Sequence, residues 1–430
     1  ESFLRFDGTY MPNERTYKGD FSGGSKHTAD FANILSGMKI LDESYNRPLQ
    51  FSMGMKTDNE NLNLSSFVIK YDNFIEGSGN LTVPLQADGN KKRKIDLKYQ
   101  LINLDLRPLL SIFKAEYKKF AENGSVYAPD SSFDINADIT AEKVILNSSD
   151  TGSLESVSFK GSWLNNTLSL DEFYAACPGN MVLSMSGSLV EENTSPQYFL
   201  KISLEGKDFQ AFLNALGLNV KTYTQATYRN AAITFNLSGN NSAVSVNDLK
   251  FLLDKMNIAG VAGVTFNTEG NIYEIQLAAD SLNLDNYLPK AEFSTAMENL
   301  REDIKSLSFL KWLNINAKFK SDKLTFRNVT MSNAVLNLDA ANGKVHISEL
   351  SADNALNSQF KISATADNLA SLDFKFDEII FDLQSRNMAE IQDRLGLPWP
   401  KWNIFKANNF IASGSYSGNL HEGNLNAKVT

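Results

Sequence analysis

One frame of alternating apolar residues occurs four times along the chain and limits its fold more than any other feature. In the first copy, an apolar run over 51–55 is followed by the polar segment KTDNEN and by a second run that begins at Leu62. The second runs of the other copies begin at Leu168, Val244 and Val345, always seven residues after the third position of the first run. A period of two is typical of half-buried strands. Each copy therefore predicts a β-hairpin, and the chain predicts an array of hairpins.

The connections between the paired runs have the composition of tight turns. They are six residues long in every copy, and all contain Asn: KTDNEN, SWLNNT, SGNNSA and DAANGK. Asn, Asp and Gly tolerate the backbone conformations that tight turns require. The connections therefore support the hairpin interpretation.

Two further pieces recur around the hairpins. An alternating run passes into a helical pattern at Asp105, Asp208, Asp285 and Asp382, with a remnant at Asp30, and we predict that these aspartates are helix N-caps rather than catalytic groups. The segments 133–146 and 313–326 also match each other in apolar spacing and precede two of the hairpins.

These pieces predict a mainly β fold with short helices, in which an elongated, twisted antiparallel β-sheet array of repeats forms an open groove. We expect residues 1–430 to be a fragment of one continuous repeat array. The expected segments are 1–50 (the end of an upstream repeat), 51–125, 126–217, 218–307 (a shorter repeat), 308–396 and 397–430 (the start of the next repeat).

Composition narrows the function classes. The 430 residues carry a net charge of −9 with an isoelectric point near 5.1, which argues against nucleic acid as a partner because phosphate binding needs a basic surface. A single cysteine, Cys177, excludes an intrachain disulfide framework. No apolar run reaches the length of a membrane-spanning helix. Since the chain starts at Glu1, we expect it to be part of a longer protein.

Residues that commonly carry catalysis or bind metals are sparse. The three histidines, His27, His346 and His421, are far apart, and no HExxH, GxSxG, P-loop or CxxC motif is present. Cys177 has no base near it in sequence and is expected to be an inert thiol. The sequence therefore predicts no catalytic residue, no metal site and no cofactor, and we expect a protein that is not an enzyme.

The remaining feature is a sheet face that carries large apolar side chains. Such faces either pack on each other and on the short helices as an ordinary core, or line a groove in an open, curved sheet. A groove of this kind could hold acyl chains, since hydrocarbon burial gains about 0.8 kcal/mol per CH₂. The candidate lipid-binding residues are Leu62, Leu64, Phe67, Leu168, Leu170, Phe173, Val244, Val246, Leu249, Val345, Ile347 and Leu350.

The order of parts resembles the AsmA family of Gram-negative envelope proteins. The segment SLNLDNYLPKA (281–291) is similar to the LDLxxYLP-like turn of that family. After a helical insertion, LNINAKFKSDKLTFRNVTMSNAVLNLDAANGKVHISELSA (313–352) follows the family pattern over its whole length. The resemblance is strong over 281–366, and the hairpin copies nearer the N-terminus match more loosely.

This resemblance implies a protein of the periplasm, anchored in the inner membrane by a helix outside this sequence. It also implies similarity to TamB-like and chorein-type β-groove proteins. The expected function is therefore non-enzymatic: a lipid-binding and transfer module that passes phospholipid between the inner and outer membranes and supports outer-membrane biogenesis. The expected partners are phospholipid acyl chains and the two membranes, or proteins in them. The alternative is an envelope scaffold or chaperone-like protein that assists outer-membrane protein assembly by edge-strand pairing.

Overall fold

The computed structural model describes residues 2–29, 46–85, 93–107, 133–146, 152–165, 167–192, 195–218, 227–268, 270–287, 314–367, 375–395, 409–419 and 422–430. The chain divides into two compact units, residues 1–219 and 220–430, and each is described separately below.

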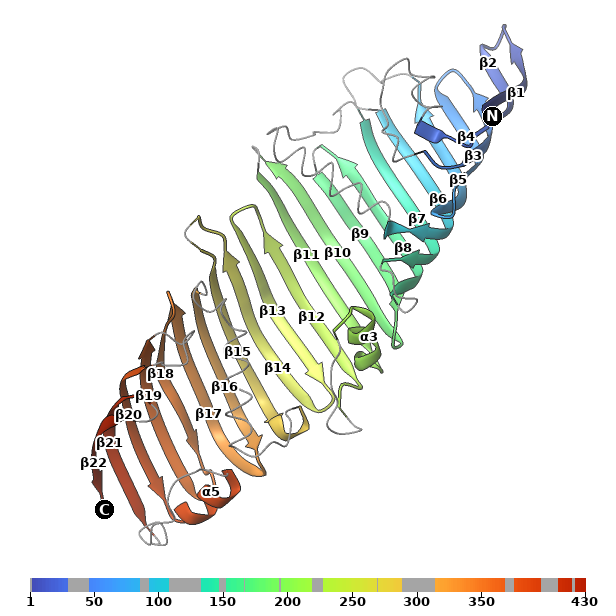
Figure 1. The fold of residues 1–430 in the computed structure, drawn as a ribbon. Coiled ribbons are helices and arrows are strands. Elements are labelled where there is room, and N and C mark those ends of the chain that lie inside the picture. The colour runs from blue at the N-terminus through green and yellow to red at the C-terminus, as the bar shows by residue number, and fades with distance from the viewer. Residues whose placement is uncertain are drawn as a thin grey trace. The chain divides into compact units, whose positions relative to one another are not determined.

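Unit 1 is an eleven-stranded twisted sheet in which every strand pairs with the next one along the chain (Figure 1). All of these pairs are antiparallel except β6–β7, which is parallel. The strands are β1 (Ser2–Met11), β2 (Thr16–Ser25), β3 (Leu49–Thr57), β4 (Asn61–Tyr71), β5 (Ile75–Pro84), β6 (Arg93–Asp105), β7 (Phe133–Ile145), β8 (Ser153–Leu164), β9 (Thr167–Cys177), β10 (Met181–Glu192) and β11 (Ser195–Gly206).

Unit 2 has the same construction, with eleven strands paired in chain order and one parallel pair, β15–β16. The strands are β12 (Ala231–Gly239), β13 (Ala243–Leu253), β14 (Met256–Thr265), β15 (Ile272–Asn283), β16 (Asn314–Phe326), β17 (Val329–Ala341), β18 (Lys344–Asp353), β19 (Ser358–Asp367), β20 (Lys375–Ser385), β21 (Phe410–Gly418) and β22 (Gly423–Val429).

The expectation of a mainly β fold with short helices in a twisted sheet is confirmed, and the expected antiparallel pairing holds for all described strand pairs except β6–β7 and β15–β16, which are parallel. A parallel pair needs a long crossover between its strands, and the chain supplies one at 106–132 and another at 284–313. The strand that follows each crossover, β7 or β16, is the recurring segment 133–146 or 313–326 of the sequence. Each of these two recurring segments is therefore the second strand of a parallel pair.

The strands form groups of four (β3–β6 and β12–β15) and of five (β7–β11 and β16–β20), which alternate along the chain. A crossover follows each four-stranded group, and a short helix follows each five-stranded group: α3 (Phe209–Ala215) or α5 (Met388–Leu395). Apart from the first two residues of β3, these groups lie within the predicted segments 51–125, 126–217, 218–307 and 308–396. That each segment is a separate repeat of the array stays a prediction.

The ends of β6, β11, β15 and β20 lie at one edge of their sheets, which we call the helical edge because the crossovers and helices start there (Figure 1). At this edge α3 rests on the β9–β10 turn, where the N–H of Asp208 donates to the carbonyl of Gly179 at 3.0 Å. Gly179 has a φ of +77°, and a Cβ there would collide with the carbonyl oxygen of Asp208. Glycine at this position lets the helix approach the turn.

The aspartates expected to cap helices serve different purposes. Asp208 is the N-cap of α3 and accepts the N–H of Ala211 at 3.1 Å, as predicted. Asp105 accepts the N–H of Arg107 at 3.0 Å and pairs with its guanidinium, which lowers the pKa of the carboxyl group. Asp30 lies outside the described residues.

The prediction was wrong for Asp285 and Asp382. The carboxylate of Asp285 accepts the backbone N–H groups of Arg327 and Asn328, at 2.5 and 2.7 Å, in the β16–β17 turn. Both turn residues have positive φ, and the aspartate joins this turn to the start of the crossover. Asp382 lies within β20, and α5 starts six residues later, where Asn387 accepts the N–H of Glu390 at 3.2 Å. The sequence pattern places this strand-to-helix joint too early because β20 continues the apolar alternation.

The edge opposite the helical edge, which we call the hairpin edge, carries the turns predicted from Asn and Asp. Asp58 accepts the N–H groups of Glu60 and Asn61, and Asn240 accepts those of Ser242 and Ala243, at 2.6–3.0 Å. These contacts confirm the prediction of tight turns within KTDNEN and SGNNSA.

Candidate apolar lipid-binding face

Each sheet has one face that is uncharged over the described strands, apart from two positions of unit 1 at the edge opposite the helical edge: Arg93, whose guanidinium lies over the ring of its partner Phe133, and Glu191, which pairs with Pro196. The register of the strand pairs assigns each residue to a face, because side chains alternate along a strand and paired residues project to the same side. We call this the apolar face. Charged and polar side chains, such as Lys98, Lys160 and Lys318, lie on the opposite face, which we call the polar face.

All twelve candidate residues lie on the apolar face of their own unit, although their spacing departs from strict alternation. In each set the third residue follows the second by three positions, as in Leu64 and Phe67. Their partners on β5, Leu81 and Gly79, are only two positions apart. A β-bulge takes up the extra residue and returns Phe67 to the face of Leu64.

The same bulge recurs in β9, β13 and β18. The partners of Leu168, Leu170 and Phe173 are Leu189, Gly187 and Met185. Those of Val244, Val246 and Leu249 are Val264, Ala262 and Gly260. Those of Val345, Ile347 and Leu350 are Ala366, Ala364 and Ile362. In every case the partners alternate by two, so the three candidates share one face.

Pairing also connects the candidates within each unit. Leu64 and Leu170 belong to one row of paired residues that crosses all eleven strands of unit 1. Val246 and Ile347 belong to the corresponding row of unit 2. The rows are Gly8–Gly19–Met55–Leu64–Leu81–Leu97–Ala137–Gly161–Leu170–Gly187–Leu200 and Leu237–Val246–Ala262–Ile275–Ala317–Leu338–Ile347–Ala364–Ile379–Tyr416–Leu425.

Sequence reasoning missed most of the face, because it followed only one strand of each hairpin. The alternation Ile95, Leu97, Tyr99 and Leu101 was visible and could have extended the face to β6. No pattern in the sequence indicated that Leu97 pairs with Ala137, because a long crossover separates their strands.

Burial on the apolar face increases toward the helical edge. On β7 the exposed fraction is 36% at Ile135, near the hairpin edge, and 5% at Val144, near the helical edge. On β9 it is 37% at Leu168 and 0% at Ala175. The helical edge is therefore closed by packed side chains, while part of the face near the hairpin edge is open to solvent.

Hydrophobic clusters account for the closed edge. In unit 1, Leu101, Ala141 and Val144 form a buried cluster to which Tyr99 and Leu154 pack. In unit 2, Val329, Met331 and Ala352 form another, and Met388 of α5 packs with Phe410 and Ala412 in a third. The short helices and turns thus complete a core at the helical edge alone, as far as the described residues show.

Glycines on the apolar face let aromatic rings lie flat on the sheet. The ring of Tyr99 occupies the space that a Cβ of Gly77 or Gly79 would need. Burial raises the pKa of the Tyr99 hydroxyl, so this side chain adds no charge to the face at neutral pH.

Groups that could support catalysis do not gather in the described part of the chain. No cluster of three His, Cys, Asp or Glu side chains able to hold a metal ion occurs among the described residues. Cys177 is buried, and burial raises the pKa of its thiol, which favours the unreactive protonated form. None of the helices in the described ranges is both long and apolar enough to span a membrane.

Comparison with protein-family models, curated proteins and solved structures finds no match to this chain. What the fold and the face establish is a class of architecture: a repeating β-sheet protein with one apolar and one polar face.

Proposed function

We propose that this chain is a non-enzymatic lipid-binding and transfer module, in which the apolar faces form an open groove for the acyl chains of phospholipids. The observation that carries the proposal is the uninterrupted uncharged row that crosses all eleven strands of each unit. Acyl chains can move along this row because none of its side chains is charged, and burying an unpaired charge against hydrocarbon is costly.

The open part of the face provides room for a ligand. A face that served only as an ordinary core would be buried at both edges of the sheet. Here Leu168 and Ile135 keep more than a third of their surface exposed, whereas residues of the same strands near the helical edge are buried. Each CH₂ group that covers such side chains would gain about 0.8 kcal/mol.

Transport between the inner and outer membranes, in the periplasm of a Gram-negative bacterium, is part of the proposal and rests on the resemblance to the AsmA family. In that setting the expected partners are phospholipids and the two membranes, and the expected role is support of outer-membrane biogenesis.

The first test is mass spectrometry of lipids extracted from protein expressed in a bacterial periplasm and purified without detergent. We expect phospholipid at a near-stoichiometric ratio in the wild type. Phe173→Asp places a charge on the apolar face and should reduce bound lipid by more than about tenfold, since desolvating a carboxylate costs several kcal/mol.

The matched control is Tyr174→Asp, one residue along β9, where the side chain projects from the polar face opposite Ser184. It should keep the wild-type lipid content. Val246→Asp, with Ser245→Asp as its control, repeats the comparison in unit 2 should either unit 1 variant fail to fold. A folded Phe173→Asp variant with as much lipid as Tyr174→Asp would refute the assignment of the face. A folded wild type with no lipid would favour the scaffold alternative.

A further inference from the structure

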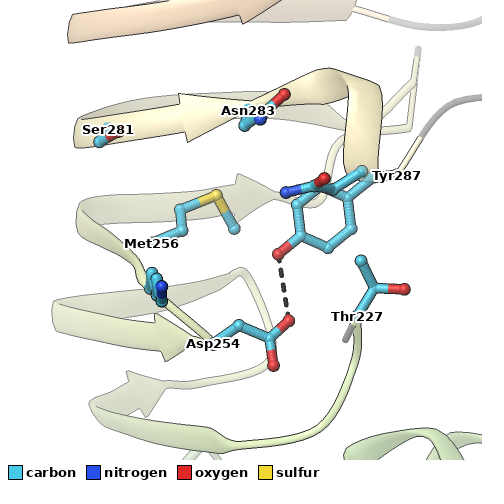
Figure 2. Close-up of a pocket in the computed structure, with 8 residues that line it drawn as sticks. Thr227, Asp254, Met256, Ser281, Asn283 and Tyr287 are labelled. Atoms are coloured by element: carbon cyan, nitrogen blue, oxygen red, sulfur yellow. Dashed lines mark hydrogen bonds between the residues drawn. The ribbon is translucent and has the colours of Figure 1, made fainter. Parts of the chain in front are cut away.

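A cavity of about 400 Å³ lies at the helical edge of unit 2, next to the apolar face. It is bounded by the β13–β14 turn on one side and by the end of β15 on the other (Figure 2). Its lining residues are Thr227, Asp254, Lys255, Met256, Ser281, Asn283, Asn286 and Tyr287.

The wall around Asp254 is held by hydrogen bonds within the protein. Its carboxylate accepts the backbone N–H groups of Tyr228, Arg229 and Asn230 at 3.0–3.2 Å. It also accepts the hydroxyl of Tyr287 at 3.2 Å (Figure 2). The ring of Tyr228 packs edge-on against that of Tyr287, with 5.3 Å between the ring centroids. The site is therefore formed before any ligand arrives.

The hydroxyl of Tyr287 is uncharged and points toward Asp254, and its oxygen can also accept a hydrogen bond from a ligand. Burial, together with the nearby charge of Asp254, raises the pKa of Tyr287 to about 12. Because its proton is donated to Asp254, the lone pairs of the phenol oxygen are available to an N–H donor in the cavity. The carboxylate behind the hydroxyl strengthens the attraction for a cation.

The opposite charge lies on the next residue of the turn. Lys255 is exposed and makes no hydrogen bond or ion pair with the other described residues. Ser281, Asn283 and Asn286 add neutral polar groups to the lining. With one carboxylate and one ammonium among its lining residues, the site matches a ligand that carries both charges, with its anion at Lys255 and its cation at Tyr287 and Asp254.

The apolar face continues from this cavity. Met256 lines the cavity, is buried and pairs with Leu253 on the apolar face. The cavity therefore borders the apolar side chains that close the helical edge of the same sheet.

We propose that this cavity binds the zwitterionic headgroup of an amine-bearing phospholipid, with the phosphodiester at Lys255 and the amine at Tyr287 and Asp254. The inference rests on the proposed lipid-binding function and gives it a headgroup preference. A lipid with a phosphodiester and no amine would gain only the contact with Lys255 and would be repelled by Asp254.

The test loads the purified full chain from vesicles that contain equal amounts of phosphatidylethanolamine and phosphatidylglycerol with identical acyl chains. Extracted lipids are then quantified by mass spectrometry. We expect the amine-bearing lipid to be enriched about tenfold on the protein, which corresponds to about 1.4 kcal/mol. Tyr287→Phe, which keeps the ring and removes the hydroxyl, and Lys255→Glu should each bring the bound ratio close to that of the vesicle.

The matched control is Lys320→Glu, which makes the same charge change on the polar face of β16. It should keep the enrichment, and total bound lipid should be similar in all of these proteins because the apolar face is unchanged. Lipid bound at the vesicle ratio by the wild type, or equal enrichment in Lys255→Glu and Lys320→Glu, would overturn the headgroup site and leave the lipid-binding proposal standing. A wild type that binds neither lipid would overturn both.

Discussion

The carboxylate of Asp254 shows how one residue can organise an edge of the sheet. It satisfies three backbone N–H groups and one hydroxyl, and it has a φ of +54°, a conformation that Asp and Asn tolerate better than most residues. Asp285 has a similar role at the β16–β17 turn, where its carboxylate accepts the backbone N–H groups of Arg327 and Asn328. Single carboxylates thus join the ends of hairpins to the chain segments beside them.

Replacement of this carboxylate by an amide should therefore weaken unit 2. In Asp254→Asn, one oxygen acceptor becomes an NH₂ donor, so at least one of the four donors loses its partner. We expect the free energy of unfolding to fall by about 1–3 kcal/mol in urea titrations. Asp322→Asn, an exposed position of β16 in the same unit, is the control and should change it by less than about 0.5 kcal/mol. Equal stabilities for the two variants would contradict the role assigned to Asp254.

At the scale of the element, the β-bulge is the feature that keeps the apolar face continuous. Without the extra residue, the two halves of β13 would present opposite sides, since a shift of one residue exchanges the faces. The bulge in β13 contains Asp248, whose φ is +52° and whose carboxylate accepts the side-chain amide of Asn236 at 2.8 Å. In β4 the corresponding bulge contains Ser66, with a φ of +49°.

The bulge can be tested with two substitutions at one position. Asp248→Val puts a β-branched side chain at a positive φ and should lower the free energy of unfolding by about 1–2 kcal/mol. Asp248→Gly adopts this conformation freely and should stay within about 0.5 kcal/mol of the wild type, since it loses only an exposed hydrogen bond. Thermal or urea unfolding measures both, and equally destabilised variants would show that the positive φ is not what matters.

At the scale of the whole molecule, stability is expected to be local. Within each unit, the strands that the structure describes pair only with their neighbours along the chain, as in repeat proteins whose stability is a sum of nearest-neighbour terms. Damage in one group of strands should therefore spread little to groups that are distant along the chain.

Hydrogen exchange measured by mass spectrometry can test whether destabilisation of one group of strands leaves distant groups unchanged. In Asp248→Val we expect faster exchange in peptides from β12 to β15 and unchanged exchange in peptides from β3 to β6. Asp248→Gly is the control and should match the wild type in both regions. A uniform increase across both groups would mean that the chain opens as one cooperative body.

The parts of the structure that could be predicted from the sequence are those that depend on the spacing of residues within one strand or turn. The alternation through Leu62 and Leu64, and the turn residues Asp58 and Asn240, correctly predicted strands and hairpins, because a strand buries every second residue and a tight turn needs particular backbone angles. The twelve candidate residues lie on one face in each unit because every copy of the frame contains the extra residue of the bulge at the same position. Whether they bind lipid stays a prediction.

Only the tertiary structure decided which strands meet across a long connection and which edge of the face is closed. The parallel pairing of Leu97 with Ala137 joins strands on either side of a crossover, and no local periodicity encodes such a contact. The joint predicted at Asp382 failed for a related reason, since the end of β20 depends on its pairing with β21 rather than on the sequence pattern alone. The closed edge arises where turns and short helices pack on the sheet, as Ala355, Met388 and Phe410 show. Burial there depends on contacts between segments far apart in the sequence, whereas the alternation of apolar residues depends only on the geometry of a single strand.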